Sequence, residues 1–453
     1  MLFTTHWLQT IFPEMNDFTK EERNINKVNT DSRQQEQQSL FVPIVGEQFD
    51  GHAYLKQAIE GGAIATLWQH NRALPDDLPT DFLVFFVEDT TTALQQLAHA
   101  YQKKINPTVI GITGSNGKTT TKDLVTSVVG TVYKTHATVG NFNNHIGLPL
   151  TILDMPTETE MLVLEMGMSD FKEIELLSDI ARPDYAIITN IGESHIEYLG
   201  TRAGIAEAKL EITYGMDSSG TLIVDGDESL LQSIQKPDKV IKCGLGEEND
   251  VIIHDISLKE QYTQFKVDHD KSDYCIPLLG KHHAKNATFA ITLAKALGIS
   301  IENIKQGLTD LNITSMRFEI LQGQNDVAII NDAYNASPTS MKASIDVVKQ
   351  MTGYQKKIVI LGDVFELGEQ SEQLHASVAD VITHPITNVY TYGQDAKCIT
   401  DHVRMQQPAI VCQHFKNEAS MMQTIKTFLD PDTLILFKAS RGMQFETLVK
   451  SIL

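Results

Sequence analysis

The sequence predicts an α/β protein of three domains built on parallel sheets covered by helices. At about 100–200 residues per domain, a chain of 453 residues corresponds to two to four domains. Short, nearly continuous apolar runs alternate with segments of helical periodicity along most of the chain, which is typical of parallel strands covered on both faces. We expect a small N-terminal α/β domain (1–103), a central phosphate-loop domain with helices on both sheet faces (104–314) and a C-terminal dinucleotide-fold-like wound sheet (315–453).

The N-terminal part reads as a unit of its own. Its apolar runs predict strands at 40–45, 63–68 and 82–87, and its periodic segments predict helices at 54–62 and 91–101. Two polar clusters, TDSR at 30–33 and FDGH at 49–52, are by themselves more typical of a turn or a helix cap than of a binding site. The segment KKINP at 103–107 is expected to link this unit to the next one.

The rest of the chain is organised around residues 109–129, VIGITGSNGKTTTKDLVTSVV. An apolar run predicts a strand, Gly114–Gly117 predict a turn that side chains would obstruct, and Lys118 begins a segment with helical spacing. A strand, a glycine loop and a helix N-terminus together form a phosphate cradle, in which a lysine reaches the terminal phosphates and a hydroxyl can bind Mg²⁺. The alternative is an ordinary glycine-rich turn, and the position between a strand and a helix favours nucleotide binding.

Two further strands deliver polar side chains to the same predicted edge. The run at 161–164 ends in Glu165, and the run at 185–188 is followed by His195. Ligands of open parallel sheets bind beyond the carboxyl ends of the strands, and hydroxyl, carboxylate and phosphate oxygens are typical ligands of Mg²⁺. Each residue also has a simpler interpretation, Glu165 as a structural cap and His195 as a core histidine.

Beyond this edge the alternation continues. A strand is expected at 221–225, a β-rich insertion at 247–273, and helices from about 281 to 298 and at 301–311. The last third predicts a wound sheet without the GxGxxG fingerprint. Its strands are expected at 327–330, 357–361, 388–392 and 433–437.

Composition excludes several classes of function. The chain has 58 acidic and 37 basic residues, a formal net charge of −21, which disfavours general binding of nucleic acid or anionic membranes. Its four cysteines show no metal-binding spacing, which indicates free thiols. No signal peptide and no apolar run of membrane-spanning length is recognisable. We therefore expect a cytoplasmic protein without membrane insertion.

Several motifs resemble those of the Mur ligases, the ATP-dependent amide-forming enzymes of peptidoglycan precursor synthesis. The resemblance covers almost the whole chain, and two of its motifs, GNFNNHIGLP and DAYNASP, resemble the members that add D-alanyl-D-alanine to UDP-N-acetylmuramoyl-tripeptide through an acyl phosphate. The motifs are GITGSNGKTTTKD, GNFNNHIGLPLTIL, LEMGM, NIGESH, AEAKLEI, GKHHAKNA, MRFE, NDAYNASP and GDVFELG.

The resemblance implies a role for individual residues. Lys118 would contact the ATP phosphates, Thr119 and Glu165 would bind one Mg²⁺, and His195 would bind a second Mg²⁺ together with a CO₂-derived carbamate on Lys209. From spacing alone, Lys209 reads as a helix-surface lysine flanked by glutamates. The other implied contacts are Gly114, Ser115, Asn116, Gly117, Thr120, Asn286 (adenine), Arg317 (phosphate) and Asp332 (ribose) for ATP; Asp31, Ser32 and Arg33 for the uridine nucleotide; and, more weakly, Tyr334 and Asn335 for the dipeptide.

Two positions depart from the family pattern. KASRG at 438–442 has Ala439 where relatives usually have glycine, and alanine is less able to adopt a positive φ. Ser337 replaces an asparagine that many relatives carry, an exchange expected to be tolerated. Three alternatives stay open: an amino-acid-adding ligase of the same family, a folylpolyglutamate synthase, and a non-catalytic ATP-binding module. We expect a monomer that acts on small molecules.

Overall fold

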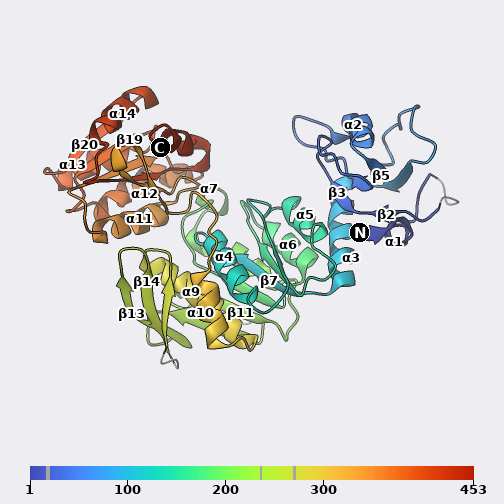
Figure 1. Cartoon of the computed structure of the whole chain (residues 1–453), viewed down its shortest axis with the longest axis horizontal. Helices are drawn as coiled ribbons and strands as arrows, with labels where there is room; N and C mark the ends of the chain where they lie inside the picture. Colours follow the sequence, from blue (N-terminus) through green and yellow to red (C-terminus); the bar gives the residue numbers. More distant parts are fainter. Residues whose placement is uncertain (17–20, 235–236, 269–271) are drawn as a thin grey trace.

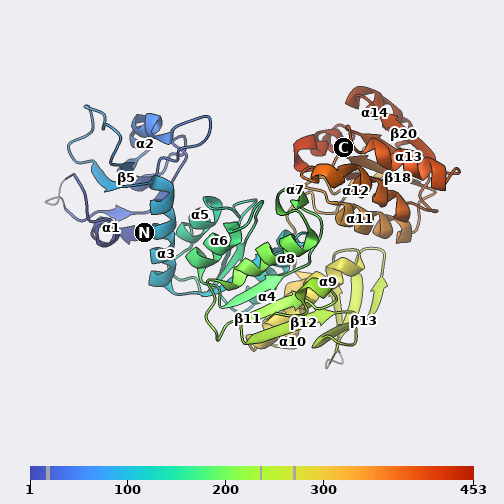
Figure 2. The same cartoon turned by 180° about the vertical axis from the view of Figure 1, so that it is seen from behind.

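The computed structural model describes residues 1–16, 21–234, 237–268 and 272–453. Helices and parallel sheets alternate through the chain, which confirms the predicted α/β class. Figure 1 shows three sheet-based units, with the blue N-terminal unit and the red C-terminal unit on either side of the green and yellow central unit. Figure 2 shows the same arrangement from behind, where β11 (Thr221–Asp225), α7 (Ile196–Leu199) and α8 (Arg202–Leu210) of the central unit are visible. None of the described helices is long and apolar enough to cross a membrane.

The N-terminal unit contains a four-stranded parallel sheet in the order β3-β4-β5-β6. The strand expected at 40–45 ends at Phe41, before Pro43, which has no N–H to donate. Helix α3 continues to Ile105, so only the end of the expected KKINP linker is non-helical. The elements are β1 (Phe3–Thr4), α1 (Thr5–Ile11), β2 (Asn24–Ile25), β3 (Lys27–Asn29), β4 (Ser39–Phe41), α2 (Leu55–Glu60), β5 (Ala63–Gln69), β6 (Leu83–Val87) and α3 (Thr90–Ile105).

The central sheet has nine strands in the order β15-β14-β13-β12-β11-β10-β7-β9-β8. The strands from β8 to β13 pair in parallel, so the phosphate-loop strand β7 lies between β10 and β9. The three strands expected to share an edge are therefore neighbours. The elements of this half are β7 (Thr108–Thr113), α4 (Lys118–Val129), β8 (Thr135–Ala137), α5 (Gly147–Leu153), β9 (Met161–Glu165), α6 (Glu173–Ala181) and β10 (Tyr185–Ile188).

The β-rich insertion forms the far edge of this sheet, where β13, β14 and β15 pair antiparallel. Helices α9 and α10 pack against α4 over a shared apolar core that includes Leu124, Val128, Ala287 and Leu308. Strand β12 has no counterpart among the predicted elements. The elements are β12 (Lys239–Gly244), β13 (Val251–Leu258), β14 (Thr263–Val267), β15 (Asp273–Ile276), α9 (Lys281–Ala296) and α10 (Ile301–Thr309).

The C-terminal unit is a six-stranded sheet in the order β16-β17-β21-β18-β19-β20, parallel except for β16. The four predicted strands are present, while β16 and β20 were not predicted. The elements are β16 (Glu319–Gln322), β17 (Ala328–Asn331), α11 (Pro338–Gln350), β18 (Lys356–Gly362), α12 (Ser371–Ser377), β19 (Asn388–Tyr392), α13 (Lys397–Gln406), β20 (Val411–Phe415), α14 (Glu418–Ile425), β21 (Thr433–Lys438) and α15 (Phe445–Lys450).

Candidate active site

The phosphate loop joins β7 to α4 at the carboxyl edge of the central sheet. Gly114 and Gly117 adopt φ values of 150° and 80°, which side chains disfavour. A Cβ at Gly114 would lie 1.8 Å from Thr189 Oγ1, and one at Gly117 would lie 2.9 Å from the Asn286 amide. Both glycines are therefore required by backbone conformation and by space, as the sequence predicts.

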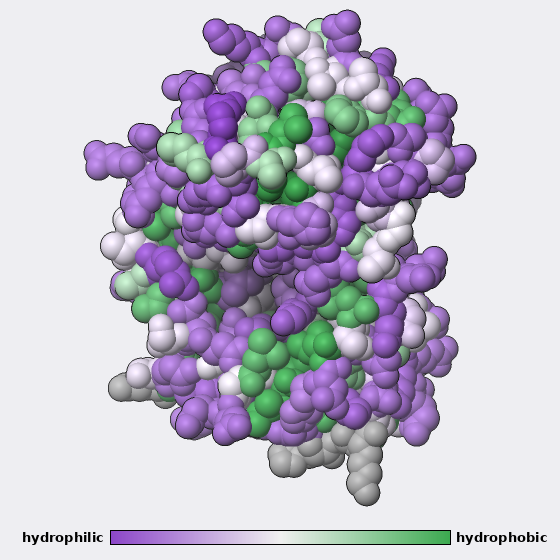
Figure 3. Space-filling view, turned by 90° about the vertical axis from the view of Figure 1, so that its left-hand side faces the viewer, coloured by the Kyte–Doolittle hydropathy of each residue, from purple (hydrophilic) through white to green (hydrophobic). Residues whose placement is uncertain are grey.

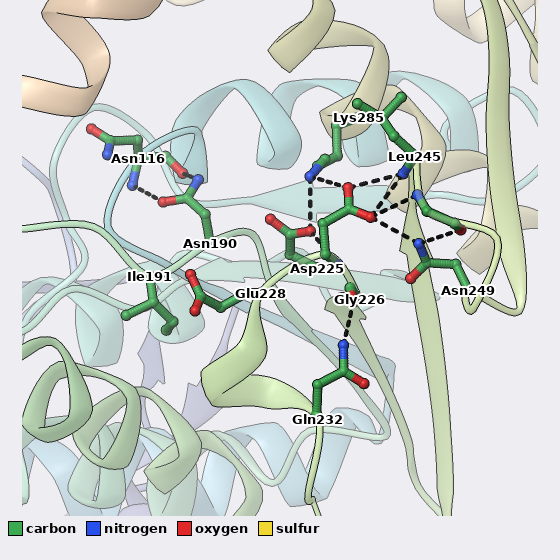
Figure 4. A network of polar contacts seen from close by, with 12 residues as sticks. Asn116, Asn190, Ile191, Asp225, Gly226, Glu228, Gln232, Leu245, Asn249 and Lys285 are labelled. Atoms are coloured by element: carbon green, nitrogen blue, oxygen red, sulfur yellow. Dashed lines mark hydrogen bonds and ion pairs between the residues drawn. The ribbon is translucent and has the colours of Figure 1, made fainter.

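The end of β10 holds this loop in place. The Asn116 amide donates to Asn190 Oδ1 (3.0 Å), and the Asn116 carbonyl accepts from Asn190 Nδ2 (2.8 Å) and Thr189 Oγ1 (2.6 Å). Figure 4 shows Asn116 and Asn190 facing one another. Gly192 donates its amide to Ser115 Oγ (2.8 Å). Neighbouring strand ends thus preorganise the loop.

Glu165 faces the start of α4. Its two oxygens accept from Thr119 Oγ1 and Asn143 Nδ2, each at 2.8 Å, and the residue is 3% exposed. Lys118 donates to the Gly114 carbonyl at 2.7 Å and reaches over the loop. A lysine, a hydroxyl and a carboxylate therefore meet at one helix N-terminus, which is the combination that binds phosphate together with a divalent cation.

Two buried lysines lie in this region. Burial lowers the pKa of Lys118; the nearby Glu165 opposes this effect and Arg317 adds to it. Burial also lowers the pKa of Lys209 well below its ordinary value, and the charge of Lys118 adds to that shift. Lys209 is 1% exposed. The interpretation of Lys209 as a surface lysine is therefore wrong.

His195 makes a contact between the central and C-terminal units. It begins α7 with a left-handed backbone (φ 65°, ψ 21°), and its Nδ1 forms an ion pair with Glu366. The backbone of the next turn joins the same loop, because the Glu197 amide donates to the Glu366 carbonyl at 3.2 Å. His195 is therefore a half-exposed residue at an interface, and the core-histidine interpretation does not apply.

The C-terminal unit brings an arginine to the phosphate loop. Arg317 donates from Nη2 to Thr119 Oγ1 (2.8 Å), its guanidinium lies 4.0 Å from the centre of the Tyr334 ring, and its Nε is buried without a partner. Asp332 is paired with the buried Lys438 at 2.7 Å. The segment that connects the two sheets thus carries Arg317 into the site, and the end of β21 supplies Lys438.

Helix α9 is anchored by a charged network close to the site (Figure 4). Lys285 contacts Asp225 and Asp227, each at 2.8 Å, at the end of β11. Burial alone would lower the pKa of Lys285, but the two carboxylates raise it. This anchor fixes the second turn of α9, where the next residue, Asn286, packs against Gly117 of the phosphate loop.

A cavity of about 850 Å³ joins these groups. On the face shown in Figure 3, a hollow with mostly hydrophilic walls separates the upper part of the molecule from the lower part. Most of the predicted site residues line the cavity: Ser115, Asn116, Gly117, Lys118, Thr119, Thr120, Glu165, His195, Asn286, Arg317, Asp332, Tyr334 and Asn335.

The remaining predicted residues lie elsewhere. Lys209 is buried and is not among the residues that line the cavity. The DSR cluster belongs to the N-terminal unit, where Arg33 forms a bidentate pair with Asp31 at 2.9 and 2.7 Å. Ser32 donates to Gln57 at 2.7 Å. The structure thus does not bring the predicted uridine-nucleotide residues into the cavity.

Several residues at the site were not predicted, among them the following five. Asn143 orients Glu165, Lys438 pairs with Asp332, and Glu366 pairs with His195. His282 and His283 lie with ring centroids 4.0 Å apart, and burial lowers the pKa of His282 to about 4. The quoted motifs GNFNNHIGLP, GKHHAKNA, KASRG and GDVFELG contain all five, so those motifs were the available signal.

The two departures from the family pattern have structural explanations. Ala439 does not have a positive φ, and the next residue, Ser440, is extended (φ −60°, ψ 149°), so the loop does not need glycine there. Ser337 caps α11 through a reciprocal pair of hydrogen bonds with Ser340. Ser337 Oγ also donates to Asn116 Oδ1 at 2.8 Å, which links the two units.

In the described ranges, no cluster of three or more His, Cys, Asp and Glu side chains is arranged to bind a metal. A cation at this edge would need phosphate oxygens to complete its ligands, as Mg²⁺ in nucleotide sites commonly does. The fold and the site together define the class: a phosphate-loop α/β protein whose nucleotide cavity is completed by a second wound sheet.

Comparisons with known proteins agree with this class. Family models match residues 24–102 ("Mur ligase family, catalytic domain"), 112–294 ("Mur ligase middle domain") and 316–441 ("Mur ligase, glutamate ligase domain"). A UDP-N-acetylmuramoyl-tripeptide–D-alanyl-D-alanine ligase from Bacillus subtilis is 47% identical over 96% of this chain and 94% of its own length.

Solved structures agree as well. A crystal structure of MurF from Acinetobacter baumannii has a TM-score of 0.87 and 30% identity, covering 99% of this chain and 98% of its own. MurF ligase from Thermotoga maritima in complex with ADP has a TM-score of 0.81 and 27% identity, covering 94% and 96%. The chain belongs to the Mur ligase family.

Proposed function

We propose that this chain is the ATP-dependent ligase that adds D-alanyl-D-alanine to UDP-N-acetylmuramoyl-tripeptide in peptidoglycan precursor synthesis. The observation that carries the proposal is the meeting of Lys118, Thr119, Glu165 and Arg317 in one cavity between two units. The relatives that resemble the chain over nearly its whole length carry the name of this ligase.

The reaction must activate a carboxylate, because joining it to an amine in water is unfavourable. The terminal carboxylate of the tripeptide attacks the γ-phosphorus of ATP, and the bond to ADP breaks to give an acyl phosphate. The amine of D-alanyl-D-alanine then attacks the acyl carbon, loses a proton, and expels phosphate that keeps one carboxylate oxygen.

The protein's part is positioning and charge neutralisation. Lys118, held at 2.7 Å from the Gly114 carbonyl, places its charge at the loop that cradles the phosphates. Arg317 brings a second positive charge from the C-terminal unit. Together they offset the repulsion between an anionic nucleophile and an anionic phosphate, and closure of the cavity protects the acyl phosphate from water.

Two magnesium sites belong to the proposal. Thr119 and Glu165, whose oxygens lie 2.8 Å apart, would hold one Mg²⁺; His195 and carbamylated Lys209 would hold the second. The donor set fits a hard cation, because it offers a hydroxyl and a carboxylate beside a phosphate loop. When bound, such ions would neutralise phosphate charge during transfer.

The carbamate on Lys209 is supported by the state of its amine. Its pKa is lowered well below the ordinary value, mainly by burial, so a neutral and nucleophilic amine is favoured. A carbamate would turn this buried amine into an oxygen ligand of negative charge.

The remaining contacts follow the family resemblance. For ATP we propose the loop residues Gly114 to Thr120 together with Asn286 for adenine, Arg317 for phosphate and Asp332 for ribose. For the uridine nucleotide we propose Asp31, Ser32 and Arg33, and for the dipeptide Tyr334 and Asn335. The cavity that most of these residues share supports the ATP assignment; the DSR cluster rests on the resemblance alone.

We also propose the division 1–103, 104–314 and 315–453, with α3 crossing the first boundary, and a cytoplasmic monomer. The separate sheets and the three family-model ranges support this division. Each unit has its own sheet. The cavity is lined by residues of the central and C-terminal units, so it lies where these two units meet.

Phosphate release from ATP, measured against a panel of acceptors, tests the function. Release that requires both UDP-N-acetylmuramoyl-tripeptide and D-alanyl-D-alanine is expected; testing lysine and diaminopimelate tripeptides would define the donor. Dependence on a free diamino acid, or on folate and glutamate, would assign the chain to another ligase of the superfamily. Absence of acceptor-dependent release would favour an ATP-binding module.

A further inference from the structure

One face of α4 carries three polar residues spaced four apart: Thr119, Asp123 and Ser127. Residues at this spacing lie on the same side of a helix. Each of them bonds either to α10 or to the linker, residues 310–318, that leads from α10 into the C-terminal sheet. Ser127 Oγ donates to the Gly307 carbonyl at 2.6 Å, Asp123 accepts from Thr314, and Thr119 accepts from Arg317 at 2.8 Å.

The connecting chain therefore runs antiparallel to α4, from the end of that helix toward the phosphate loop. Helix α10, which precedes the linker, is in close contact with α4, because a Cβ at Gly307 would lie only 2.5 Å from Val128 Cα. The linker then leads to Arg317, which is the first residue of this segment to enter the cavity. The linker between the two units thus lies along the surface of the phosphate-loop helix α4.

Asp123 makes the middle one of these three contacts with α4, and it is the last contact before the linker bends. Its Oδ2 accepts the Thr314 amide at 2.9 Å, its Oδ1 accepts Thr314 Oγ1 at 3.3 Å, and the residue is 8% exposed. Beyond it, Met316 and Phe318 adopt left-handed φ values of 62° and 53°. Side chains rarely adopt this conformation, so the chain turns sharply on both sides of Arg317.

We propose that Asp123 is a positioning residue for the ligase reaction: it pins the linker at Thr314, so that Arg317 is delivered to the phosphate loop. The proposal rests on the proposed function, because it assigns Arg317 to the ATP phosphates. Asp123 itself does not line the cavity. It acts through the linker, and the pivot between the two units lies at 315–318, after the pinned residue.

The contact is well suited to this role. A charged acceptor of a backbone amide is stronger than a neutral one, and this one is shielded from water. Asp123 is on the same rigid helix whose first turn holds Thr119 and Lys118. The distance between Thr314 and the phosphate loop therefore stays fixed when the rest of the C-terminal unit moves.

Three variants test the proposal. Asp123→Ala removes the anchor, and Asp123→Asn keeps one oxygen for the Thr314 amide. Ser127→Ala is the matched control, because it removes a long-range bond from the same helix, one turn away, to α10 and not to the linker. Hydrogen exchange of the peptide covering 312–318 is measured on the ligand-free proteins, together with Tm, kcat, and KM for ATP and for D-alanyl-D-alanine.

Asp123→Ala is expected to exchange the Thr314 amide faster and to lose about tenfold to a hundredfold in kcat, since misplacing a charged group by about 1 Å has an effect of this size. Asp123→Asn should restore most of the protection of the Thr314 amide and most of kcat. Ser127→Ala should keep kcat and the exchange of 312–318; it should lower Tm less than Asp123→Ala, which also removes the ion pair of Asp123 with the buried Lys122. KM for D-alanyl-D-alanine should change little in all three.

Equal losses of kcat in Asp123→Ala and Ser127→Ala would reduce Asp123 to a purely structural residue and overturn the proposal. Faster exchange at 312–318 with unchanged kcat would also overturn it. If the unaltered protein releases no phosphate with both substrates, the proposed function fails instead, and the exchange data still report on whether Asp123 pins the linker.

Discussion

His195 and Glu366 pair across the boundary between the central and C-terminal sheets, and both have left-handed backbones, with φ values of 65° and 63°. Such conformations are costly for residues other than glycine and persist where the surrounding structure imposes them. Glu366 contacts His195 at Nδ1, and we therefore predict that Nε2 is the ring nitrogen available to a ligand. A carboxylate on one imidazole nitrogen is the usual support of a histidine that binds a metal through the other.

Glu366→Gln tests this support. We expect kcat to fall about tenfold, the effect typical of removing an outer partner of a metal-binding histidine, and the Mg²⁺ concentration for half-maximal activity to rise. Glu197→Gln is the control, because this exposed carboxylate follows His195 by two residues and has no side-chain partner in the described chain. Equal behaviour of the two variants would exclude a role for the pair.

Lys118→Ala should abolish ADP formation. The variant removes the positive charge at the loop, and the loss of one preorganised donor costs about a hundredfold to a thousandfold in rate. Release of ADP in the presence of both substrates is the measurement, and Lys134→Ala, an exposed lysine of the same unit, is the control. Near-normal turnover of Lys118→Ala would contradict the phosphate-loop assignment.

Lys209→Ala should be nearly inactive and should regain some activity with added short carboxylic acids, which can replace the missing carbamate oxygens. Burial lowers the pKa of Lys209, so below that pKa the amine is protonated and cannot react with CO₂, and carbamylation increases as pH rises through it. A carbamate signal from ¹³C-labelled bicarbonate in the unaltered protein, absent from Lys209→Ala, is the direct check. Full activity without rescue would remove the carbamate from the mechanism.

The DSR cluster makes a pH-dependent prediction. Hydrogen bonds from Arg33 lower the pKa of Asp31 to about 2, below its ordinary value of 3.8. The pair therefore stabilises the fold at pH values above the pKa of Asp31 in the unfolded chain. This stabilisation is lost as pH falls from about 4 toward 2. Affinity for the UDP substrate should be constant from about pH 5 to 8 as far as Asp31 is concerned, and Arg33→Ala should weaken it. Calorimetric titration with UDP checks both; undiminished affinity in Arg33→Ala would contradict the assignment.

The strand–loop–helix unit and the strand ends could be predicted because local signals determine them. Apolar runs define β7, β9 and β10, and the glycines at 114 and 117 have no substitute. The burial of Lys209 could not be predicted, since its neighbours Glu207 and Glu211 resemble those of a surface helix. Glu211 is in fact buried as well, where it accepts the backbone amides that begin α6.

Contacts between segments that are distant in the sequence could not be predicted either, because periodicity and motifs report only on neighbouring residues. The pairings of Asp123 with Thr314 and of Ser337 with Asn116 join residues about two hundred positions apart. Helix α3 passed its expected end because residues 102–105 can extend a helix as easily as a linker, and packing against α5 decides between them. Periodicity describes one element at a time, and the site is made where several elements meet.

The central claim is that the γ-phosphate of ATP passes to the tripeptide's carboxylate before phosphate is released. UDP-N-acetylmuramoyl-tripeptide labelled with ¹⁸O in both oxygens of its terminal carboxylate tests this directly, with mass spectrometry of the phosphate formed in the presence of ATP and D-alanyl-D-alanine. The account predicts one ¹⁸O atom in each phosphate, because the oxygen that attacks phosphorus leaves with it. Unlabelled phosphate, formed at the rate of ADP, would contradict the account and indicate that water is the acceptor.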